Sequence, residues 1–442
     1  MAHREGSLDA PTRHPLDWKS ASFYDRQSLD HELERVFDIC HGCRRCVSLC
    51  QAFPTLFSLV DDSDTMEVDG VRKADYAQVV NQCYLCDLCY LTKCPYVPPH
   101  DWNVDFPHLM LRAKAVQFQE SPPPLRDRLM TSTTAVGRLA TLPLVDVTVN
   151  ALNRSSGFRK GLEATLGIDR RATLPQYHRH TIRQRTRPLA REITPVAAGE
   201  TSGKVALFAT CYGNANRPDL GEDFFKVFQH NGIHIELVPG NHCCGMPKLE
   251  LGDLASVEAL KQHSIPILAD LVRQGFDVIA PVPSCVLMFK QELPLMYPDD
   301  PDVTAVQRAF FDPFEYLHQR HKAGLMNTEF ANELGDVSYH VACHLRVQKI
   351  GLKTRDILQL IPGTRIDAIE RCSGHDGTYA LKVESYDHAV KIARPVVRKL
   401  AQQAAPHLAS DCPMASAHLA SLQEGDAKPS HPMTLLRHAY GL

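Results

Sequence analysis

The chain has 442 residues, of which 44% are hydrophobic and 22% charged, and its formal net charge is -3 at pH 7. This length suggests about two to four structural units, and the balanced charge argues against a nucleic-acid-binding protein with a broad basic surface and against an acidic tail. Fifteen cysteines stand out, and an odd number cannot all pair as disulfides. The N-terminus MAHREGSLDAPTRHPLDWKS has no apolar core typical of a signal peptide, so we expect a cytoplasmic chain with reduced thiols that bind metal.

No uninterrupted apolar run reaches the roughly 18 residues that a membrane-spanning helix needs. The best candidate, residues 140–152, is short and contains Asp146. We therefore expect any contact with a membrane to be peripheral, on the inner face of the cytoplasmic membrane, or to run through a partner.

Residues 30–115, after an N-terminal extension at 1–29, are expected to form an all-helical ferredoxin-like domain. Residues 31–43 and 74–86 place apolar side chains at helical spacing and lead into two cysteine runs. The first run is Cys40-x2-Cys43-x2-Cys46-x3-Cys50, and the second is Cys83-x2-Cys86-x2-Cys89-x4-Cys94.

The spacing of these runs predicts two [4Fe-4S] clusters. In two-cluster ferredoxins the fourth cysteine of each run binds the cluster of the other run. We expect one cluster on Cys40, Cys43, Cys46 and Cys94, and the other on Cys83, Cys86, Cys89 and Cys50. Four residues separate Cys89 from Cys94 where three are usual, so Cys94 needs a local bulge or an extra half-turn. Structural zinc, which favours two CxxC pairs set apart by a longer loop, fits poorly.

Residues 116–202 are expected to be a helical, basic linker. An amphipathic helix is expected at 106–120, and a proline stop follows it at 121–124. Nine basic residues lie between 159 and 191 against only two acids, and they are Arg159, Lys160, Arg170, Arg171, Arg179, Arg183, Arg185, Arg187 and Arg191. The segment is either an ordinary solvated surface or a docking site for an acidic partner or an anionic membrane. No aromatic platform accompanies the charge, so we expect no nucleic acid.

From residue 203 onward, short β-rich runs alternate with helical stretches, which predicts parallel α/β structure. Runs at 204–210, 233–239 and 276–284 lead to Cys211, to Cys243-Cys244-Gly245 and to Cys285. Runs at 336–342, 364–371 and 407–411 lead in the same way to Cys343, Cys372 and Cys412. The corresponding cysteines are 132, 129 and 127 residues apart, so we expect a duplication with two pseudo-symmetric lobes, at 203–328 and 329–442. The cysteines should meet at the carboxyl edges of the sheets.

A double ferredoxin run followed by two Cys...CCG...Cys lobes resembles the iron-sulfur subunits of the superfamily that includes anaerobic glycerol-3-phosphate dehydrogenase, glycolate oxidase and heterodisulfide reductase, all with CCG domains. The resemblance extends from about residue 30 to the end of the chain. A complete lobe motif of this superfamily is Cys, CCG and CxxC, but here Met288, Ser373 and Ala415 replace three of its cysteines.

The two lobes differ in how many cysteines remain to bind a metal, with four in lobe one and three in lobe two. Lobe one would still hold a third iron-sulfur cluster on Cys211, Cys243, Cys244 and Cys285. In lobe two, Cys343, Cys372 and Cys412 would need His344, His375, Asp376 or a ligand from the other lobe. The alternative is that they are simply buried small side chains.

The resemblance implies an iron-sulfur electron-transfer subunit of an oxidoreductase, which relays single electrons between a flavoprotein dehydrogenase and an acceptor such as quinone. The chain has no GxGxxG after a strand, no P-loop, no GxSxG and no HExxH, so no catalytic residue of its own is assigned. Two alternatives stay open. One is a reductase of a disulfide or of a peroxidase-type partner that uses the lobe-one metal site. The other is a redox-sensing or assembly module whose lobes are scaffold.

Overall fold

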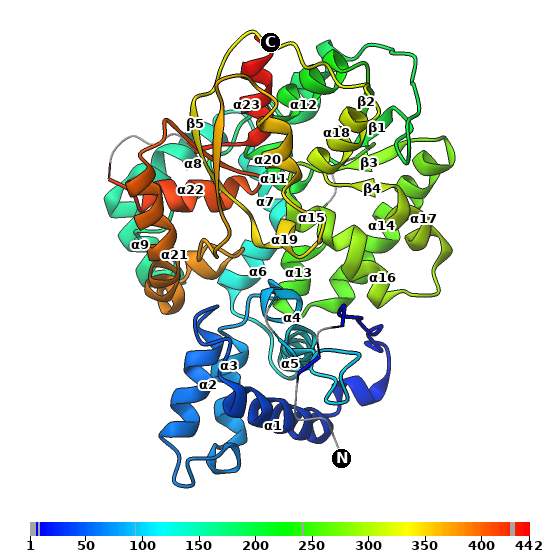
Figure 1. Cartoon of the computed structure of the whole chain (residues 1–442). Coiled ribbons are helices and arrows are strands. Elements are labelled where there is room, and N and C mark those ends of the chain that lie inside the picture. Colours follow the sequence, from blue (N-terminus) through cyan, green and yellow to red (C-terminus); the bar gives the residue numbers. More distant parts are fainter. Residues whose placement is uncertain (1–5, 8, 93, 241–242, 425–428) are drawn as a thin grey trace.

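The computed structural model describes residues 6–7, 9–92, 94–240, 243–424 and 429–442. The chain combines a helical N-terminal part with two parallel β-sheets covered by helices, which confirms the expected mixture of helical and α/β structure. Figure 1 shows the N-terminal helices, in blue, packed below the α/β part.

Helices around the two cysteine runs make up the N-terminal part. They are η1 (Ala21–Tyr24), α1 (Arg26–Cys43), α2 (Ala52–Asp61), η2 (Val68–Gly70), η3 (Lys73–Asp75), α3 (Tyr76–Val80), α4 (Leu88–Thr92) and α5 (Phe106–Glu120). The side chain of Asp25 caps α1 by accepting the N–H of Ser28 at 2.7 Å. The helix predicted at 74–86 is shorter than expected, because α3 ends at Val80 and the backbone at Leu85 has a φ of 56°. The cysteines of the second run therefore lie on a loop and on the short α4.

Five short helices follow in the segment 116–202, which was expected to be helical, although the sequence did not predict their bounds. They are α6 (Leu125–Thr131), α7 (Thr133–Ala140), α8 (Val145–Arg154), α9 (Ser156–Leu166) and α10 (Ile182–Thr186), followed by the turn η4 (Arg187–Leu189). In the part of the chain that the structure describes, no single helix has the length and apolar content to cross a membrane, and only α7 and α8 together, bent by 106°, meet that test by length and composition.

Two four-stranded parallel sheets share one strand order. The first sheet has the order β2-β1-β3-β4 and the second β6-β5-β7-β8. Their strands are β1 (Lys204–Leu207), β2 (His234–Leu237), β3 (Asp277–Ile279), β4 (Phe310–Phe311), β5 (Asp336–His340), β6 (Arg365–Ile369), β7 (His407–Ser410) and β8 (Pro429–Ser430). The six predicted strands are confirmed, and the two-residue edge strands β4 and β8 were not predicted.

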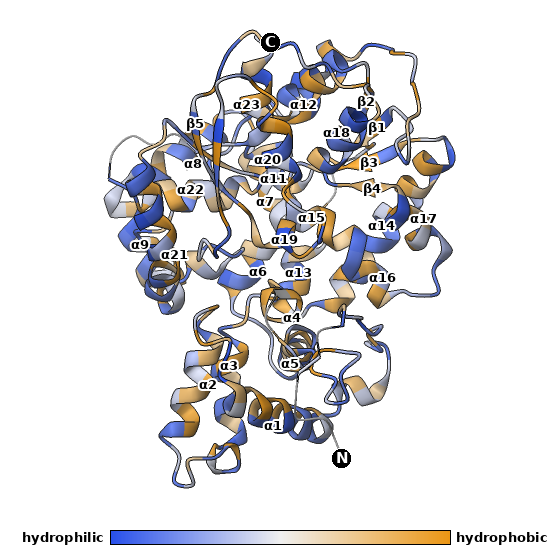
Figure 2. Cartoon of the chain, in the orientation of Figure 1, coloured by the Kyte–Doolittle hydropathy of each residue, from blue (hydrophilic) through white to orange (hydrophobic). Residues whose placement is uncertain are grey.

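Helices connect these strands and cover both sheets. They are α11 (Cys211–Ala215), α12 (Pro218–His230), α13 (Met246–Leu251), α14 (Leu254–Arg273), α15 (Pro283–Leu287), η5 (Met288–Glu292), α16 (Leu293–Met296), α17 (Pro301–Ala309), α18 (Pro313–Lys322), α19 (Cys343–Arg346), α20 (Lys353–Leu358), η6 (Tyr379–Leu381), α21 (Val383–Gln403), α22 (Pro413–Ser421) and α23 (Pro432–Ala439). Strands β3 and β4 are buried and mostly hydrophobic (Figure 2), and the ring of Phe310 stacks on Phe289 at 4.8 Å. Burial of both faces is what a parallel sheet with helical crossovers requires.

The segment before α1 joins the N-terminal helices to the first sheet. The indole N–H of Trp18 donates to the carbonyl of Met296 at 3.1 Å. The buried guanidinium of Arg13 pairs with Asp105 at 2.9 Å, with Asp87 of the second cysteine run, and with Glu292 at 3.7 Å. A buried cation shared by carboxylates from three segments holds the second cysteine run against the α/β part.

Candidate metal centre

The first group of thiols combines Cys40, Cys43 and Cys46 with Cys94 of the other run. Burial raises the pKa of the Cys40 thiol well above its ordinary value, and the neighbouring Cys94, Cys46 and Cys43 raise it further. The N–H of Cys94 donates to the carbonyl of Cys89 at 2.8 Å. The predicted bulge falls partly on residue 93, which lies outside the described residues.

The second group combines Cys83, Cys86 and Cys89 with Cys50 of the first run. Burial raises the pKa of Cys89 well above its ordinary value, and Cys83, Cys86 and Cys50 are the next causes. Cys46 also acts on Cys89, so the two groups are neighbours.

Backbone N–H groups point at the sulfur atoms of both groups. Those of Ala52 and Phe53, in the first turn of α2, donate to Cys50. Those of Tyr96 and Val97 donate to Cys94. Such donors stabilise sulfur-bound negative charge, and they tune the reduction potential of iron-sulfur clusters.

The donor set distinguishes a cluster from a single ion. Among the described residues, no three or more His, Cys, Asp or Glu side chains are arranged to hold one metal ion. Two groups of four mostly half-buried thiols with N–H donors fit an iron-sulfur cluster instead, because a cluster is larger than one ion and is bound by cysteine thiolates. Structural zinc would need four ligands that converge on one point.

Four further thiols meet at the carboxyl edge of the first sheet. Cys211 donates to the sulfur of Cys243 at 4.0 Å, and Cys244 is hydrogen-bonded to both Cys243 and Cys285. Donation from the Cys211 and Cys244 thiols holds the pKa of Cys243 well below its ordinary value. All four predicted lobe-one cysteines are thus brought together.

Three further residues of the first lobe lie beside these cysteines in the sequence, Met288, Gly245 and His242. Met288, which replaces a motif cysteine, is fully buried in the hydrophobic core, beside Gly245. Gly245 has a φ of 101° and precedes α13, a conformation that other residues rarely adopt. His242 lies outside the described residues.

The second sheet brings together fewer thiols. Cys343 donates to the sulfur of Cys372 and holds the pKa of Cys372 below its ordinary value. Cys412 follows β7, and burial raises its pKa to about 11. Ser373 and Ala415 are buried where the motif has cysteines. The lobe motif supplies three thiols at this site, and Cys86 of the second cysteine run lies near Cys343.

The second group of thiols lies against the loop that follows β6. Burial raises the pKa of Cys86, and Cys372, Asp376 and Cys50 raise it further. The rings of Tyr84 and Tyr379 meet at 4.2 Å, and the hydroxyl of Tyr379 donates to the side chain of Gln82. The thiols therefore form a continuous series from the first group, through the second, to the Cys343–Cys372 pair.

A cavity of about 950 Å³ lies where the two sheets, the second cysteine run and helices α6–α9 meet. Its wall includes seven cysteines, Cys86, Cys211, Cys244, Cys285, Cys343, Cys372 and Cys412. The helices contribute apolar side chains such as Leu129, Leu139, Val145 and Phe158. The cavity therefore joins the end of the thiol series to a largely apolar space.

Four buried side chains in the wall have polar atoms without a hydrogen-bond partner. These atoms are Nε2 of His344, His375 and His418 and Oδ2 of Asp376. Burial lowers the pKa of His375 to about 3 and that of His418 to about 4, and it raises the pKa of Asp376 well above its ordinary value. The two imidazoles are therefore neutral near pH 7, and burial favours the protonated, uncharged form of Asp376. Unsatisfied buried groups of this kind indicate a binding site for a molecule with hydrogen-bonding atoms.

Sequence reasoning singled out His344, His375 and Asp376 but missed His418. The only available signal was its position about one and a half turns into α22, which follows Cys412. The linker was expected to be helical, but its contribution of α6–α9 to the apolar wall was not foreseen.

The basic segment at 159–191 does not form one positive face. Arg159 is buried and donates to the carbonyls of Asp169 and Ala172 at 2.8 and 2.7 Å. Others pair with acids, as Arg171 does with Asp169 at 2.7 Å and Arg185 with Glu222 at 3.4 Å. Much of this charge is therefore neutralised within the chain.

The cysteine-rich domain family called CCG matches residues 205–290, which contain the four thiols of the first sheet. Over 345 residues the chain is 28% identical to a subunit of the anaerobic glycerol-3-phosphate dehydrogenase of Escherichia coli K12, covering 76% of this chain and 82% of that protein. It is 27% identical over 255 residues to a subunit of the fumarate reductase (CoM/CoB) of Methanothermobacter marburgensis, covering 55% and 48%. It is also 27% identical over 186 residues to lactate utilization protein A of Bacillus cytotoxicus, covering 41% and 75%.

Proposed function

Because this chain belongs to the CCG-domain superfamily of oxidoreductase iron-sulfur subunits, we propose that it relays single electrons between a flavoprotein dehydrogenase and an apolar acceptor such as a quinone. The observation that carries this proposal is the position of the second thiol group. It adjoins the first group on one side and Cys372 at the cavity on the other. The relatives are named as subunits of larger enzymes, which supports a redox partner.

Two [4Fe-4S] clusters would be bound by the two N-terminal thiol groups, as their spacing predicts. Cys211, Cys243, Cys244 and Cys285 would bind a third iron-sulfur cluster, and Cys343, Cys372 and Cys412 would remain thiols. A bound cluster supplies a centre that takes up and releases one electron at a time. The chain's part is to hold each centre by buried thiolates and to point N–H groups at the sulfurs.

The proposed domains are an extension at 1–29, an electron-transfer domain at 30–115, a helical linker at 116–202, and duplicated lobes at 203–328 and 329–442. The identical strand order of the two sheets supports the duplication. The cysteines that follow equivalent strands also support the duplication. Strands β1 and β5 each lead to a cysteine that begins a helix.

Electrons would enter at the first thiol group. It lies beneath the loop at 42–48, where Arg44, Arg45 and Val47 are exposed, and Val47 is 51% exposed. Arg44 pairs with Asp61 at 2.5 Å, which leaves the exposed Arg45 beside Val47 as a suitable contact for an acidic redox protein. The second group is farther inside, against the cavity.

The cavity favours a neutral acceptor over an anion. Among the described residues of its wall, Arg217 is the one Lys or Arg, and it is already paired with Asp219 at 2.7 Å. An acceptor with carboxylate or phosphate groups would leave its charge uncompensated. His375 and His418 are instead neutral groups that can hydrogen-bond to carbonyl oxygens, while the α6–α9 side chains cover an apolar ring or tail.

The proposal is tested by the oxidation of the reduced protein. Anaerobic protein is reduced with dithionite, freed of excess reductant and mixed with menadione, a neutral naphthoquinone, while the return of cluster absorbance is followed. We expect rapid oxidation by menadione, and a rate at least about tenfold lower in the His375→Phe/His418→Phe variant, which loses two hydrogen bonds. His31→Phe, exposed on α1, should match the wild type.

Two results would overturn the proposal. One is equal menadione rates in wild type and the double variant at equal iron content. The other is no oxidation by menadione but rapid oxidation by a disulfide or a peroxide, which would establish the reductase alternative.

A further inference from the structure

Helices α7 and α8 form an elbow whose outer surface is apolar. Leu139 is 66% exposed, Leu142 50%, Leu144 79% and Val147 63%. Most exposed large hydrophobic side chains of the described chain lie between 125 and 158. Leu144, at the tip of the elbow, has a φ of 70°, so the backbone adopts an unfavourable conformation while presenting an apolar side chain to solvent. A contiguous apolar surface of this kind marks an interaction site.

The exposed charges along the elbow's own stretch of chain have one sign. Between residues 121 and 160 the exposed ionised side chains are Arg128, Arg138, Arg154 and Lys160, and all four are basic. The two acids of this stretch, Asp127 and Asp146, are buried. Asp127 pairs with Arg126 at 3.0 Å, and Asp146 accepts the N–H of Arg179 at 3.3 Å. An ordinary solvated surface mixes charges of both signs, whereas this one would be attracted to an anionic surface.

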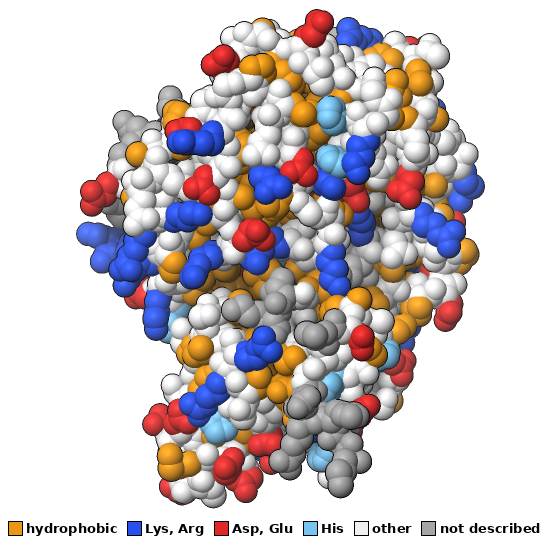
Figure 3. All heavy atoms as spheres, viewed as in Figure 1, with side chains coloured by type: hydrophobic (Ala, Val, Ile, Leu, Met, Phe, Trp, Pro, Cys, Tyr) orange, Lys and Arg blue, Asp and Glu red, His pale blue; other side chains and the backbone are white. Residues whose placement is uncertain are grey.

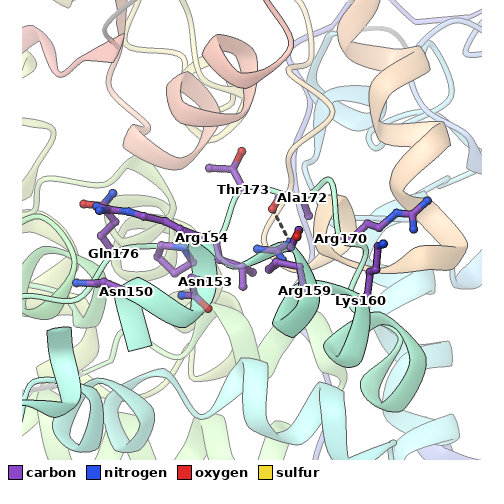
Figure 4. A pocket seen from close by; sticks show the side chains of 12 residues that line it. Asn150, Asn153, Arg154, Arg159, Lys160, Arg170, Ala172, Thr173 and Gln176 are labelled. Carbon is purple, nitrogen blue, oxygen red and sulfur yellow. Dashed lines mark hydrogen bonds between the residues drawn. The ribbon is translucent and has the colours of Figure 1, made fainter. Parts of the chain in front are cut away.

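A basic pocket of about 430 Å³ lies at the far end of the elbow, between α8, α9 and residues 170–176 (Figure 4). Arg154, Arg159, Lys160 and Arg170 line it, and no acid does. Arg159 is only 7% exposed, and its Nε has no hydrogen-bond partner. Arg170 lies 3.7 Å from Glu163, outside the pocket. Space-filling atoms show Lys and Arg side chains gathered at the edge where Figure 1 places α9 and α21 (Figure 3). A buried guanidinium with a free N–H, among further cations, suits a phosphate group.

The elbow is also part of the cavity wall. Leu139 and Val145 line the cavity and are exposed at the surface as well. The basic pocket shares Asn153 and residues 173–176 with the cavity. The apolar surface, the basic pocket and the cavity therefore meet at the same helices.

We infer that the elbow and the basic pocket form a docking surface for an anionic phospholipid bilayer. The aliphatic side chains at the tip insert at the boundary of the acyl chains, and the headgroup phosphate of a lipid occupies the basic pocket. Protein interfaces are typically enriched in aromatic residues, whereas the elbow tip is aliphatic with a purely basic rim, as in helices that lie on membranes. Docking places the mouth of the cavity against lipid. This last step, delivery of an apolar acceptor from the bilayer, rests on the proposed function.

The experiment is flotation of the anaerobic full-length protein with two kinds of vesicles, phosphatidylcholine alone and phosphatidylcholine mixed with phosphatidylglycerol. We expect binding to the anionic vesicles only, weakened by salt. Leu144→Glu/Val147→Glu should lower partitioning by at least about tenfold. Arg154→Gln and Lys160→Gln should each lower it by about fivefold. Met66→Glu and Val196→Glu change exposed apolar residues elsewhere and should bind as the wild type does.

Several outcomes would overturn this inference. Equal binding of both vesicle types, no binding, or unchanged binding in the elbow variants would each do so. So would loss of self-association in the elbow variants without any vesicle binding, which would make a second copy the occupant. If Arg154→Gln weakens inorganic phosphate binding but leaves vesicle binding intact, the pocket binds free phosphate instead. Leu144 and Val147 do not line the cavity, so their variants should keep the wild-type menadione rate in solution, and this separates a failure of docking from a failure of electron transfer.

Discussion

The rings of Tyr84 and Tyr379 meet edge to face with their centroids 4.2 Å apart. Tyr84 lies in the second cysteine run, and Tyr379 lies in the loop that carries Cys372 and Asp376. This contact therefore holds the last N-terminal thiols against the wall of the cavity. Electron transfer depends on such fixed spacing, so the pair links the packing of the two parts to the proposed relay.

Removing one ring of this pair should weaken both stability and electron transfer. Tyr379 is buried, so we expect Tyr379→Ala to lower the free energy of unfolding by about 3 kcal/mol through the cavity it leaves. The rate of menadione oxidation should fall as well. Urea unfolding under anaerobic conditions and stopped-flow oxidation measure the two effects.

The matched control is Tyr379→Phe, which keeps the ring contact and loses only the hydrogen bond to Gln82. It should cost about 1 kcal/mol and leave the oxidation rate close to wild type. Equal behaviour of the Ala and Phe variants would show that the ring contact has no role.

If the fourth cysteine of each run binds the cluster of the other run, substitutions in the two runs should affect the same cluster in a predictable way. Cys50 is grouped with Cys83, Cys86 and Cys89, whereas Cys94 is grouped with the first run. Cys50→Ser should therefore alter the same electron paramagnetic resonance signal as Cys89→Ser, and Cys94→Ser the same signal as Cys43→Ser. If Cys50→Ser and Cys43→Ser instead alter one signal together, each run holds its own cluster and the proposed ligand sets are wrong.

The two sheets also meet around buried carboxyl groups, and Asp312 should make stability depend on pH. Burial, with Asp411 and Glu315 nearby, raises its pKa from 3.8 to about 7. The native state therefore holds this proton more tightly than the unfolded state, so the contribution of Asp312 to stability is greatest below about pH 4 and is lost as the pH rises through about 7.

Asp312→Asn keeps an oxygen that can accept the N–H of Phe314, as Oδ1 of Asp312 does at 2.9 Å. The variant should gain stability relative to wild type as the pH rises from 5 to 8, by a few kcal/mol at most. Denaturation midpoints at the two pH values measure this. A constant difference between the proteins would show that Asp312 titrates normally.

The sequence predicted the cysteine-bearing strands well. It predicted less of the edge strands, the helix bounds and the cavity wall that surround the thiols. The six strands that lead to cysteines were predicted because β-rich runs end at a cysteine, and this local signal does not depend on tertiary contacts. Strands β4 and β8 were missed because two-residue strands are defined only by their neighbours in the sheet. The helix at 74–86 was predicted too long, since periodicity does not show that Leu85 adopts a positive φ.

The elbow and the cavity depend on tertiary structure. In α7 and α8 the apolar residues face outward, so their pattern does not identify a face packed on the core. His418 and Asp376 reach the cavity from different segments of the second sheet, and nothing in their local sequence shows that Cys86 lies beside them. Their roles are visible only when the chain is folded.

The most direct test of the central claim is the iron and acid-labile sulfide content of anaerobically purified protein, with the Cys211→Ser/Cys285→Ser variant alongside. The account predicts about twelve atoms of each per wild-type chain, and about eight in the variant, whose two N-terminal clusters remain. Zinc in place of iron, or a variant with fewer than about four iron atoms, would contradict the claim that the N-terminal thiols hold two clusters that carry electrons to the cavity.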